Sequence, residues 1–157
     1  MPSICERSYF YSMDVDSDIN AVRFRWNGQP TGEEVRYGAN QLLGFVRSRA
    51  VSGLIVDTRR VTAHPRSSVE WLVRTWMPKV ATAGIQHVAV VHESNLLARA
   101  EMEALKHRVQ QASSMPLFFT AESHEEARRW TAEQNRSITS FSHLLRYLSS
   151  LTLFSPS

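Results

Sequence analysis

Two short apolar runs, one on each side of a helical stretch, constrain the fold of this chain most. The runs lie at 54–56 and 88–91, and neither alternates apolar with polar residues. Strands that are buried on both faces have this composition, as in a parallel sheet covered by helices. Between the runs, apolar residues recur at the spacing of one helix face, at Val69, Leu72, Val73 and Trp76. The segment therefore predicts two parallel strands joined by a helix.

The other elements follow from the same periodicities. Apolar and polar residues alternate at 21–26, after a run at 9–14, which predicts an N-terminal β-hairpin. Glu34 lies three residues after Thr31 in a capping box that opens a helix, and 116–119 reads as a short apolar strand. The summed order predicts an α/β fold: a mostly parallel, five-stranded mixed sheet with an N-terminal hairpin and about four helices.

Three features stand out in the helix between the two apolar runs. Ser67 or Ser68 is expected to cap its N-terminus, and Pro78 is expected to end or kink it. Trp71 lies off the apolar face, because at about 100° per residue it points nearly opposite Trp76. An aromatic residue in this position is either tucked under the preceding loop or exposed for a partner.

The chain divides into a domain at 8–133 and a tail at 134–157. A chain of 157 residues suits one domain. The tail is rich in serine and has no acidic residue. Apolar residues at helical spacing within it, Phe141, Leu144, Leu145 and Leu148, predict a short amphipathic helix. We expect this helix to pack back on the domain or on a dimer partner.

Composition narrows the class of protein. The net charge is +3 without a block of like charges, so we do not expect nucleic-acid binding. Cys5 is the only cysteine, which suits a reducing cytoplasm. No apolar stretch approaches the roughly 20 residues of a membrane span, and no secretory signal opens the chain. Among His64, His87, His92 and Glu93 no metal-ligand spacing occurs, and we expect neither metal nor cofactor.

Polar residues gather where the two central strands should end. In open parallel sheets, ligands bind outside the carboxyl ends of the strands. The predicted rim comprises residues from both strand ends and from the loop and helix start between them: Asp57, Thr58, Arg59, Arg60, His64, Arg66, Ser67, Ser68, His92 and Glu93. Helix-start amides favour an anion, so this rim could hold a carboxylate or phosphate. Alternatively, Asp57 pairs with an arginine and caps loop amides.

A family resemblance is carried by four stretches: VDTRRV at 56–61, VEWLVRTWMPKVATAG at 69–84, HVAVV at 87–91 and FFTAESHEEARRW at 118–130. In these stretches and in the order of its elements, the chain resembles the STAS-like domains. These are anti-sigma-factor-antagonist-like proteins, here of a bacterial branch of single-domain members. The resemblance covers roughly 8–132.

The resemblance implies a non-enzymatic binding module. Antagonist-type relatives bind a kinase-like partner and are switched by phosphorylation of a serine, and related folds bind lipids or small molecules. The family's phosphorylated serine corresponds to a position at or near Arg66, beside Ser67 and Ser68. This chain has neither the aspartate nor the glycine that flank that serine. The resemblance therefore predicts a binding surface and not a phosphoswitch.

We thus expect a cytoplasmic binding or regulatory module that recognises a protein partner or a small anionic or lipid-like ligand, through the rim and the face that bears Trp71. No catalytic motif is present, because neither a nucleophile elbow nor a Gly-rich oxyanion loop surrounds any serine. Two alternatives stay open. One is a small hydrolase or transferase that uses Asp57, His64, His92 and Ser67, and the other is a structural homodimer.

Overall fold

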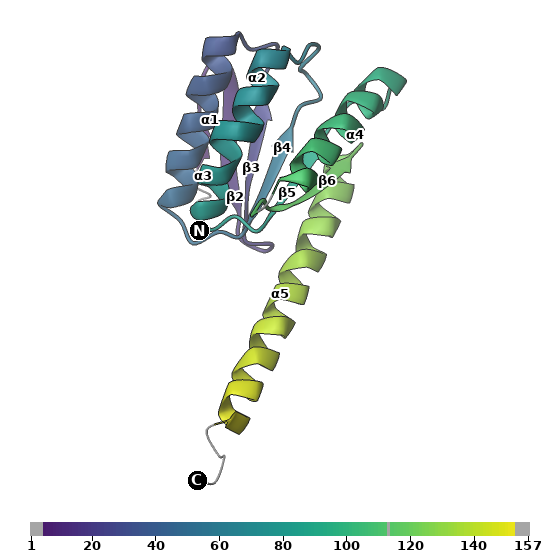
Figure 1. The fold of residues 1–157 in the computed structure, drawn as a ribbon. Coiled ribbons are helices and arrows are strands. Elements are labelled where there is room, and N and C mark those ends of the chain that lie inside the picture. The colour runs from purple at the N-terminus through teal and green to yellow at the C-terminus, as the bar shows by residue number, and fades with distance from the viewer. Residues whose placement is uncertain (1–4, 113, 153–157) are drawn as a thin grey trace.

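A mixed sheet, drawn in Figure 1, organises the residues that this computed structural model describes, which are 5–112 and 114–152. In order across the sheet, the strands are β1 (Cys5–Arg7), β2 (Tyr11–Asp16), β3 (Ala21–Trp26), β4 (Gly53–Asp57), β5 (His87–Val91) and β6 (Leu117–Ala121). Strands β1 to β3 pair antiparallel and β3 to β6 pair parallel. The α/β fold and its mostly parallel sheet with an N-terminal hairpin are confirmed, and β1 is an additional edge strand that the sequence did not predict.

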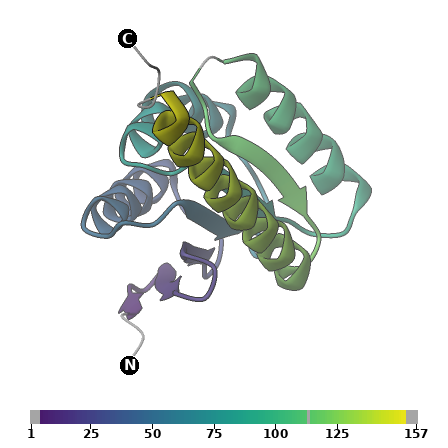
Figure 2. The same cartoon turned by 90° about the horizontal axis from the view of Figure 1, so that it is seen from below.

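The helices lie on both faces of the sheet. They are α1 (Gly32–Arg47), the continuous run α2 (Arg66–Trp71), η1 (Leu72–Trp76) and α3 (Met77–Thr82), then α4 (Leu96–Gln111) and α5 (His124–Thr152). Because β3 to β6 follow one another in sequence, crossovers of one hand place all the connecting helices on the same face. Helix α5 follows the last strand and covers part of the opposite face, as Figure 2 shows from below.

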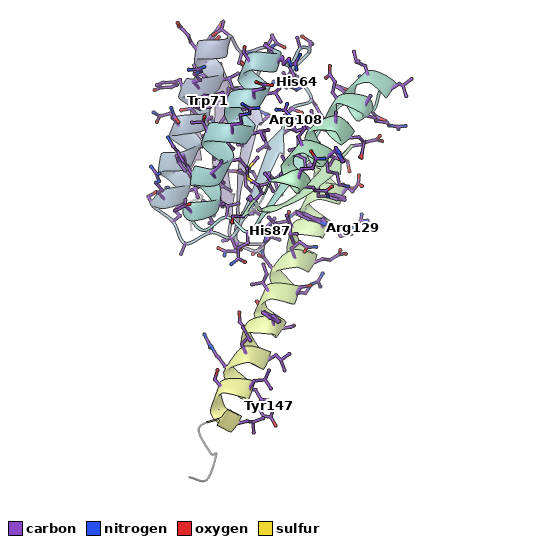
Figure 3. The ribbon with its side chains drawn as sticks, in the orientation of Figure 1. His64, Trp71, His87, Arg108, Arg129 and Tyr147 are labelled. Atoms are coloured by element: carbon purple, nitrogen blue, oxygen red, sulfur yellow. The ribbon has the colours of Figure 1, made fainter. Side chains whose placement is uncertain are left out.

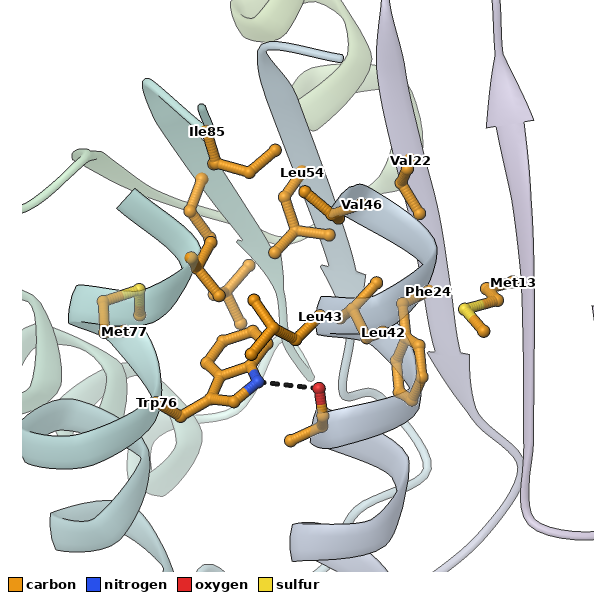
Figure 4. Close-up of a cluster of buried hydrophobic side chains, with 14 of the residues drawn as sticks. Met13, Val22, Phe24, Leu42, Leu43, Val46, Leu54, Trp76, Met77 and Ile85 are labelled. Carbon is orange, nitrogen blue, oxygen red and sulfur yellow. Dashed lines mark hydrogen bonds between the residues drawn. The ribbon is translucent and has the colours of Figure 1, made fainter. Parts of the chain in front are cut away.

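Alternation along the strands divides the core between these two faces. Leu54 and Val88 pack against α1, η1, α3 and α4, in the large cluster drawn in Figure 4. Ile55 and Ala89 point the other way and pack against α5. The second face is rich in alanine, and these small side chains let α5 approach the sheet closely: Ala21, Ala89, Ala121 and Ala127.

The helix between β4 and β5 passes through a π-helical turn at Leu72–Trp76. The backbone N–H of Met77 donates to the carbonyl of Leu72, five residues earlier. Pro78 follows directly and has no N–H to donate, and a π-turn is one way for a helix to accommodate such a residue. Pro78 therefore does not end the helix, which continues to Thr82.

Two glycines of α1 provide a matched pair of substitutions. A Cβ added at Gly38 would lie 2.6 Å from Cη2 of the buried Trp26 indole, whereas no atom lies within 4 Å of the corresponding position at Gly44. We expect Gly38→Ala to lower the free energy of unfolding by about 1–3 kcal/mol, because the indole must shift. Gly44→Ala should raise it by about 0.5–1 kcal/mol through helix propensity. Urea unfolding followed by circular dichroism measures both, and effects of the same sign would contradict this packing.

Candidate functional site

The predicted rim centres on Asp57, the last residue of β4. Its carboxylate accepts hydrogen bonds from the Arg59 guanidinium, Nη2 at 2.7 Å and Nε at 3.0 Å, and from the Arg59 backbone N–H at 3.0 Å. Burial alone would raise the pKa of Asp57, but the hydrogen bonds from Arg59 and the charges of Arg59 and Arg25 together hold that pKa below its ordinary value. The structure therefore shows Asp57 paired with an arginine and capping a loop amide, as one of its two predicted roles requires.

A polar cleft of about 340 Å³, which we call the rim cleft, lies between the loop after β4 and the start of α4. Its lining combines five predicted rim residues with residues of α4 and the loop: Thr58, Arg59, Val61, Thr62, His64, His92, Glu93, Asn95, Leu97, Ala98 and Glu101. The structure thus brings Thr58, Arg59, His64, His92 and Glu93 together, as the sequence predicted.

His64 lines the rim cleft and is hydrogen-bonded at one of its two ring nitrogens. Its Nδ1 lies 3.1 Å from Oε2 of Glu101 on α4, a carboxylate that accepts the Nδ1–H. Its Nε2 is buried and has no hydrogen-bond partner among the described residues. In the neutral imidazole the Glu101 contact fixes the proton on Nδ1, so Nε2 presents a lone pair. The site therefore holds a buried acceptor that lacks a donor.

An apolar cavity of about 130 Å³ lies beneath the rim cleft, between the sheet and the helices α1, η1 and α4. It shares Thr58, Val61 and His64 with the cleft. Trp26 and Trp76 are among its walls, and the π-helical turn supplies Leu72 and Val73. Its remaining walls are mainly aliphatic and aromatic side chains of the core, including Phe24, Val35, Ala39, Leu42, Val56, Val69, Val88, Val90, Met102, Leu105 and Phe118. The polar cleft and the apolar cavity thus adjoin at these three shared residues, and we call the two together the amphipathic site.

Several predicted site residues lie elsewhere. Arg60, Arg66 and Ser67 are exposed and line neither the cleft nor the cavity. Ser68 is buried and lines the cavity, but neither Ser67 nor Ser68 caps the helix: the N-cap is Pro65, without a side-chain hydrogen bond. The expected serine cap is therefore wrong, because the helix begins at Arg66, two residues earlier than a Ser67 cap would require.

Trp71 is partly buried and lies against Arg36 of α1. The Arg36 guanidinium lies 5.4 Å from the centroid of the Trp71 ring, and the ring packs on the edge of the core. Trp71 and His64 are labelled in Figure 3, and only His64 belongs to the cavity lining. Trp71 is thus a packing residue between two helices and not part of the cleft.

A second polar hollow, missed by the sequence reasoning, lies on the sheet face that α5 leaves open. This basic groove has a volume of about 470 Å³ and includes four arginines and two aspartates: Arg7, Arg23, Arg25, Arg59, Asp14 and Asp57. His124 closes one side, and its pKa is lowered by burial and by the charges of Arg23 and Arg59. The alternation of Arg23 and Arg25 on β3 was the available signal, because residues two apart share a face of a strand.

The hydrolase or transferase alternative requires a nucleophile in contact with a base, and the described residues show no such contact between the predicted candidates. Nδ1 of His92 donates to the Glu93 carbonyl at 2.8 Å, and the Thr58 hydroxyl donates to the Val91 carbonyl at 2.8 Å. Within 5–112 and 114–152, no serine or threonine hydroxyl is hydrogen-bonded to the imidazole of His64 or His92. The hydrolase reading thus lacks the pairing that activates a hydroxyl.

Known proteins give no family assignment for the chain. No family model, curated protein or solved structure matches it. In the part of the chain that the structure describes, no group of three or more His, Cys, Asp or Glu side chains could hold a metal ion. None of the described helices combines the length and the apolar character needed to span a bilayer. The geometry of the site itself is therefore the basis for any functional assignment.

Proposed function

We propose that the protein is a non-enzymatic binding module whose ligand is a small amphipathic molecule held at the carboxyl edge of the sheet. One observation carries the proposal: an apolar cavity and a polar cleft share lining residues, among them His64, whose buried Nε2 has no hydrogen-bond partner among the described residues. The apolar body of an amphipathic ligand would fill the cavity, and its hydrogen-bonding head would donate to this nitrogen.

The cavity sets the size of the apolar body. Its volume of about 130 Å³ is close to that of engineered cavities of about 150 Å³ that stay dry and bind benzene. A single aromatic ring or a chain of about six carbons therefore fits. Trp26 and Trp76 would contact such a ring directly.

The rim cleft sets the chemistry of the head. In the neutral imidazole, Nε2 of His64 accepts a hydrogen bond, so the head that matches this form is a hydroxyl. A carboxylate or phosphate is less suitable, because Glu93 and Glu101 line the cleft while the Arg59 charge is compensated by Asp57. We therefore favour the lipid-like half of the predicted ligand class over the anionic half. The STAS-like resemblance and a protein partner stay predictions.

Intrinsic tryptophan fluorescence tests the proposal with two probes of equal shape. Phenol and toluene are titrated into the protein, and we expect saturable quenching by both, since two indoles line the cavity. Phenol should bind about tenfold more tightly, because only its hydroxyl satisfies Nε2, and tenfold corresponds to about 1.4 kcal/mol. Benzoate should bind more weakly than phenol.

Replacement of the acceptor provides the control. In His64→Leu, phenol and toluene should bind with similar affinity, because the buried acceptor is gone. Arg66→Ala, on the exposed start of α2, should preserve the wild-type preference for phenol. Absence of saturable quenching by either probe would rule out the cavity as a ligand site, and an unchanged preference in His64→Leu would exclude His64 as the head acceptor.

A further inference from the structure

Helix α5 leaves the domain and carries an uncovered apolar stripe. The first part of the helix is anchored, since Trp130 stacks on Phe119 at 4.9 Å and Asn135 accepts a hydrogen bond from Ser52 at 2.8 Å. Beyond Asn135, every described side chain up to Leu151 is exposed except the partly buried Ile138. Figure 1 shows this half running away from the sheet, and Tyr147 near its end is labelled in Figure 3. The predicted separate tail helix is thus the continuation of α5, and it does not pack back on the domain.

The stripe has the spacing of a helix-packing seam. Ile138, Phe141, Leu145 and Leu148 follow one another at intervals of three, four and three residues, and Leu144 and Leu151 lie beside them. The exposed members retain between 47% and 60% of their accessible surface; we call this set the α5 stripe: Phe141, Leu144, Leu145, Leu148 and Leu151. A helical segment of this length is marginal in water unless an apolar face is packed, so the stripe requires a partner.

We infer that the α5 stripe binds the α5 stripe of a second copy of this chain. Charged residues beside an apolar seam favour a partner that carries the opposite charges, and no charged residue lies beside the α5 stripe within 138–151. The charged residues of the segment, Arg136 and Arg146, lie on the opposite face with His143, so two copies meet without like-charge repulsion. A membrane surface is the less suitable partner, because its polar face would carry only two arginines among serines.

The available area suits a weak dimer. Each side chain of the stripe exposes roughly 100 Å², about half of what a large apolar side chain buries. Five such side chains from each copy would bury roughly 1,000 Å² in total, which is the lower bound for a specific interface. The dimer should therefore dissociate in the micromolar range, and it would be isologous, with the same stripe on both partners.

Sedimentation velocity of the full chain tests this inference. The wild type should shift from the monomer mass of 17.9 kDa towards twice that mass as its concentration rises from about 1 to about 200 µM. The doubly substituted Leu145→Glu/Leu148→Glu should remain monomeric at the top of this range. The control His143→Glu/Ser150→Glu adds the same number of acidic groups to the opposite face and should dimerise like the wild type.

Two outcomes would overturn the inference. These are a wild type that is monomeric throughout and a stripe variant that dimerises as well as the control. If the monomeric wild type also floats with vesicles containing about 30% anionic lipid, the stripe is assigned to a membrane surface. Thermal unfolding of both variants should remain cooperative, because the substituted residues lie outside both core clusters. The fluorescence titration with phenol tests ligand binding in the cavity separately. The proposals of ligand binding and of dimerisation can therefore fail independently.

Discussion

Trp76→Ala is expected to lower the free energy of unfolding by about 3–5 kcal/mol, the usual loss when a buried large aromatic is truncated. Trp76 is 5% exposed and packs in the middle of the main core, where its indole N–H donates to the Ala39 carbonyl at 2.7 Å (Figure 4). The substitution removes the apolar contacts and this link between η1 and α1, and it enlarges a cavity that is already present. Urea unfolding in the absence of any added ligand measures the loss.

Trp71→Ala is the matched control, because it truncates the same residue type five positions earlier on the same helix. Trp71 is only half-buried and contacts Arg36 through its ring face, so its loss should cost about 1 kcal/mol. A conservative Trp76→Phe should fall between the two, because it keeps apolar contact and removes the N–H, a loss of about 1–1.5 kcal/mol or more. Equal destabilisation by Trp71→Ala and Trp76→Ala would contradict the assignment of only Trp76 to the core.

Most of the fold could be predicted because its signals are local. A strand such as β4 is an unbroken apolar run between polar residues, and α1 opens on a capping box that the structure reproduces in full. The pairing of Asp57 with Arg59 was foreseeable for the same reason, since the two residues are two apart. Strand β1 escaped prediction because its three residues, at the edge of the sheet, are too few for a period to be recognised.

The amphipathic site was predictable only in part. Topology placed His64 and His92 at one edge, but Glu101, which orients His64, is 37 residues away on α4. The cavity depends on how the sheet and the helices on one of its faces fail to fill the space between them, and no sequence pattern encodes such a volume. Whether α5 contacts the domain beyond Asn135 likewise depends on where the sheet ends. Apolar helical spacing indicated a packed face and left the partner open.

His87 should make the protein lose stability as the pH falls below about 6.5. Its side chain is fully buried, with Nε2 3.1 Å from the Asn135 carbonyl oxygen and Nδ1 without a partner in the described structure. Burial lowers the pKa of His87, and the hydrogen bond to Asn135 offsets only part of this effect. A proton added to Nδ1 would meet no acceptor, whereas the unfolded chain binds that proton with an ordinary pKa of about 6.5.

The sign and the window of the effect follow from proton binding. Between the ordinary pKa and the lowered folded-state pKa, the unfolded state binds more protons, so stability falls with pH by at most about 1.4 kcal/mol per pH unit for this one residue. Above about pH 6.5 the stabilisation is fully present. His124, whose pKa is lowered by burial and by neighbouring arginines, adds a separate loss of the same sign. Asp57, whose pKa is lowered, acts in a different window, because its stabilisation disappears only as the pH falls below about 4.

Three histidine variants separate these contributions. Urea unfolding at about pH 7.5, 6.5 and 5.5, at one protein concentration, gives the pH slope of the unfolding free energy. His87→Gln keeps a donor for Asn135 and cannot titrate, so the slope should fall by up to about 1.4 kcal/mol per pH unit even where absolute stability is lower. His124→Gln should remove a separate part of the slope, and His143→Gln, on the exposed end of α5, controls for the loss of one histidine. A slope in His87→Gln that equals the slope of His143→Gln would show that the His87 imidazole is not held neutral by burial in the folded protein.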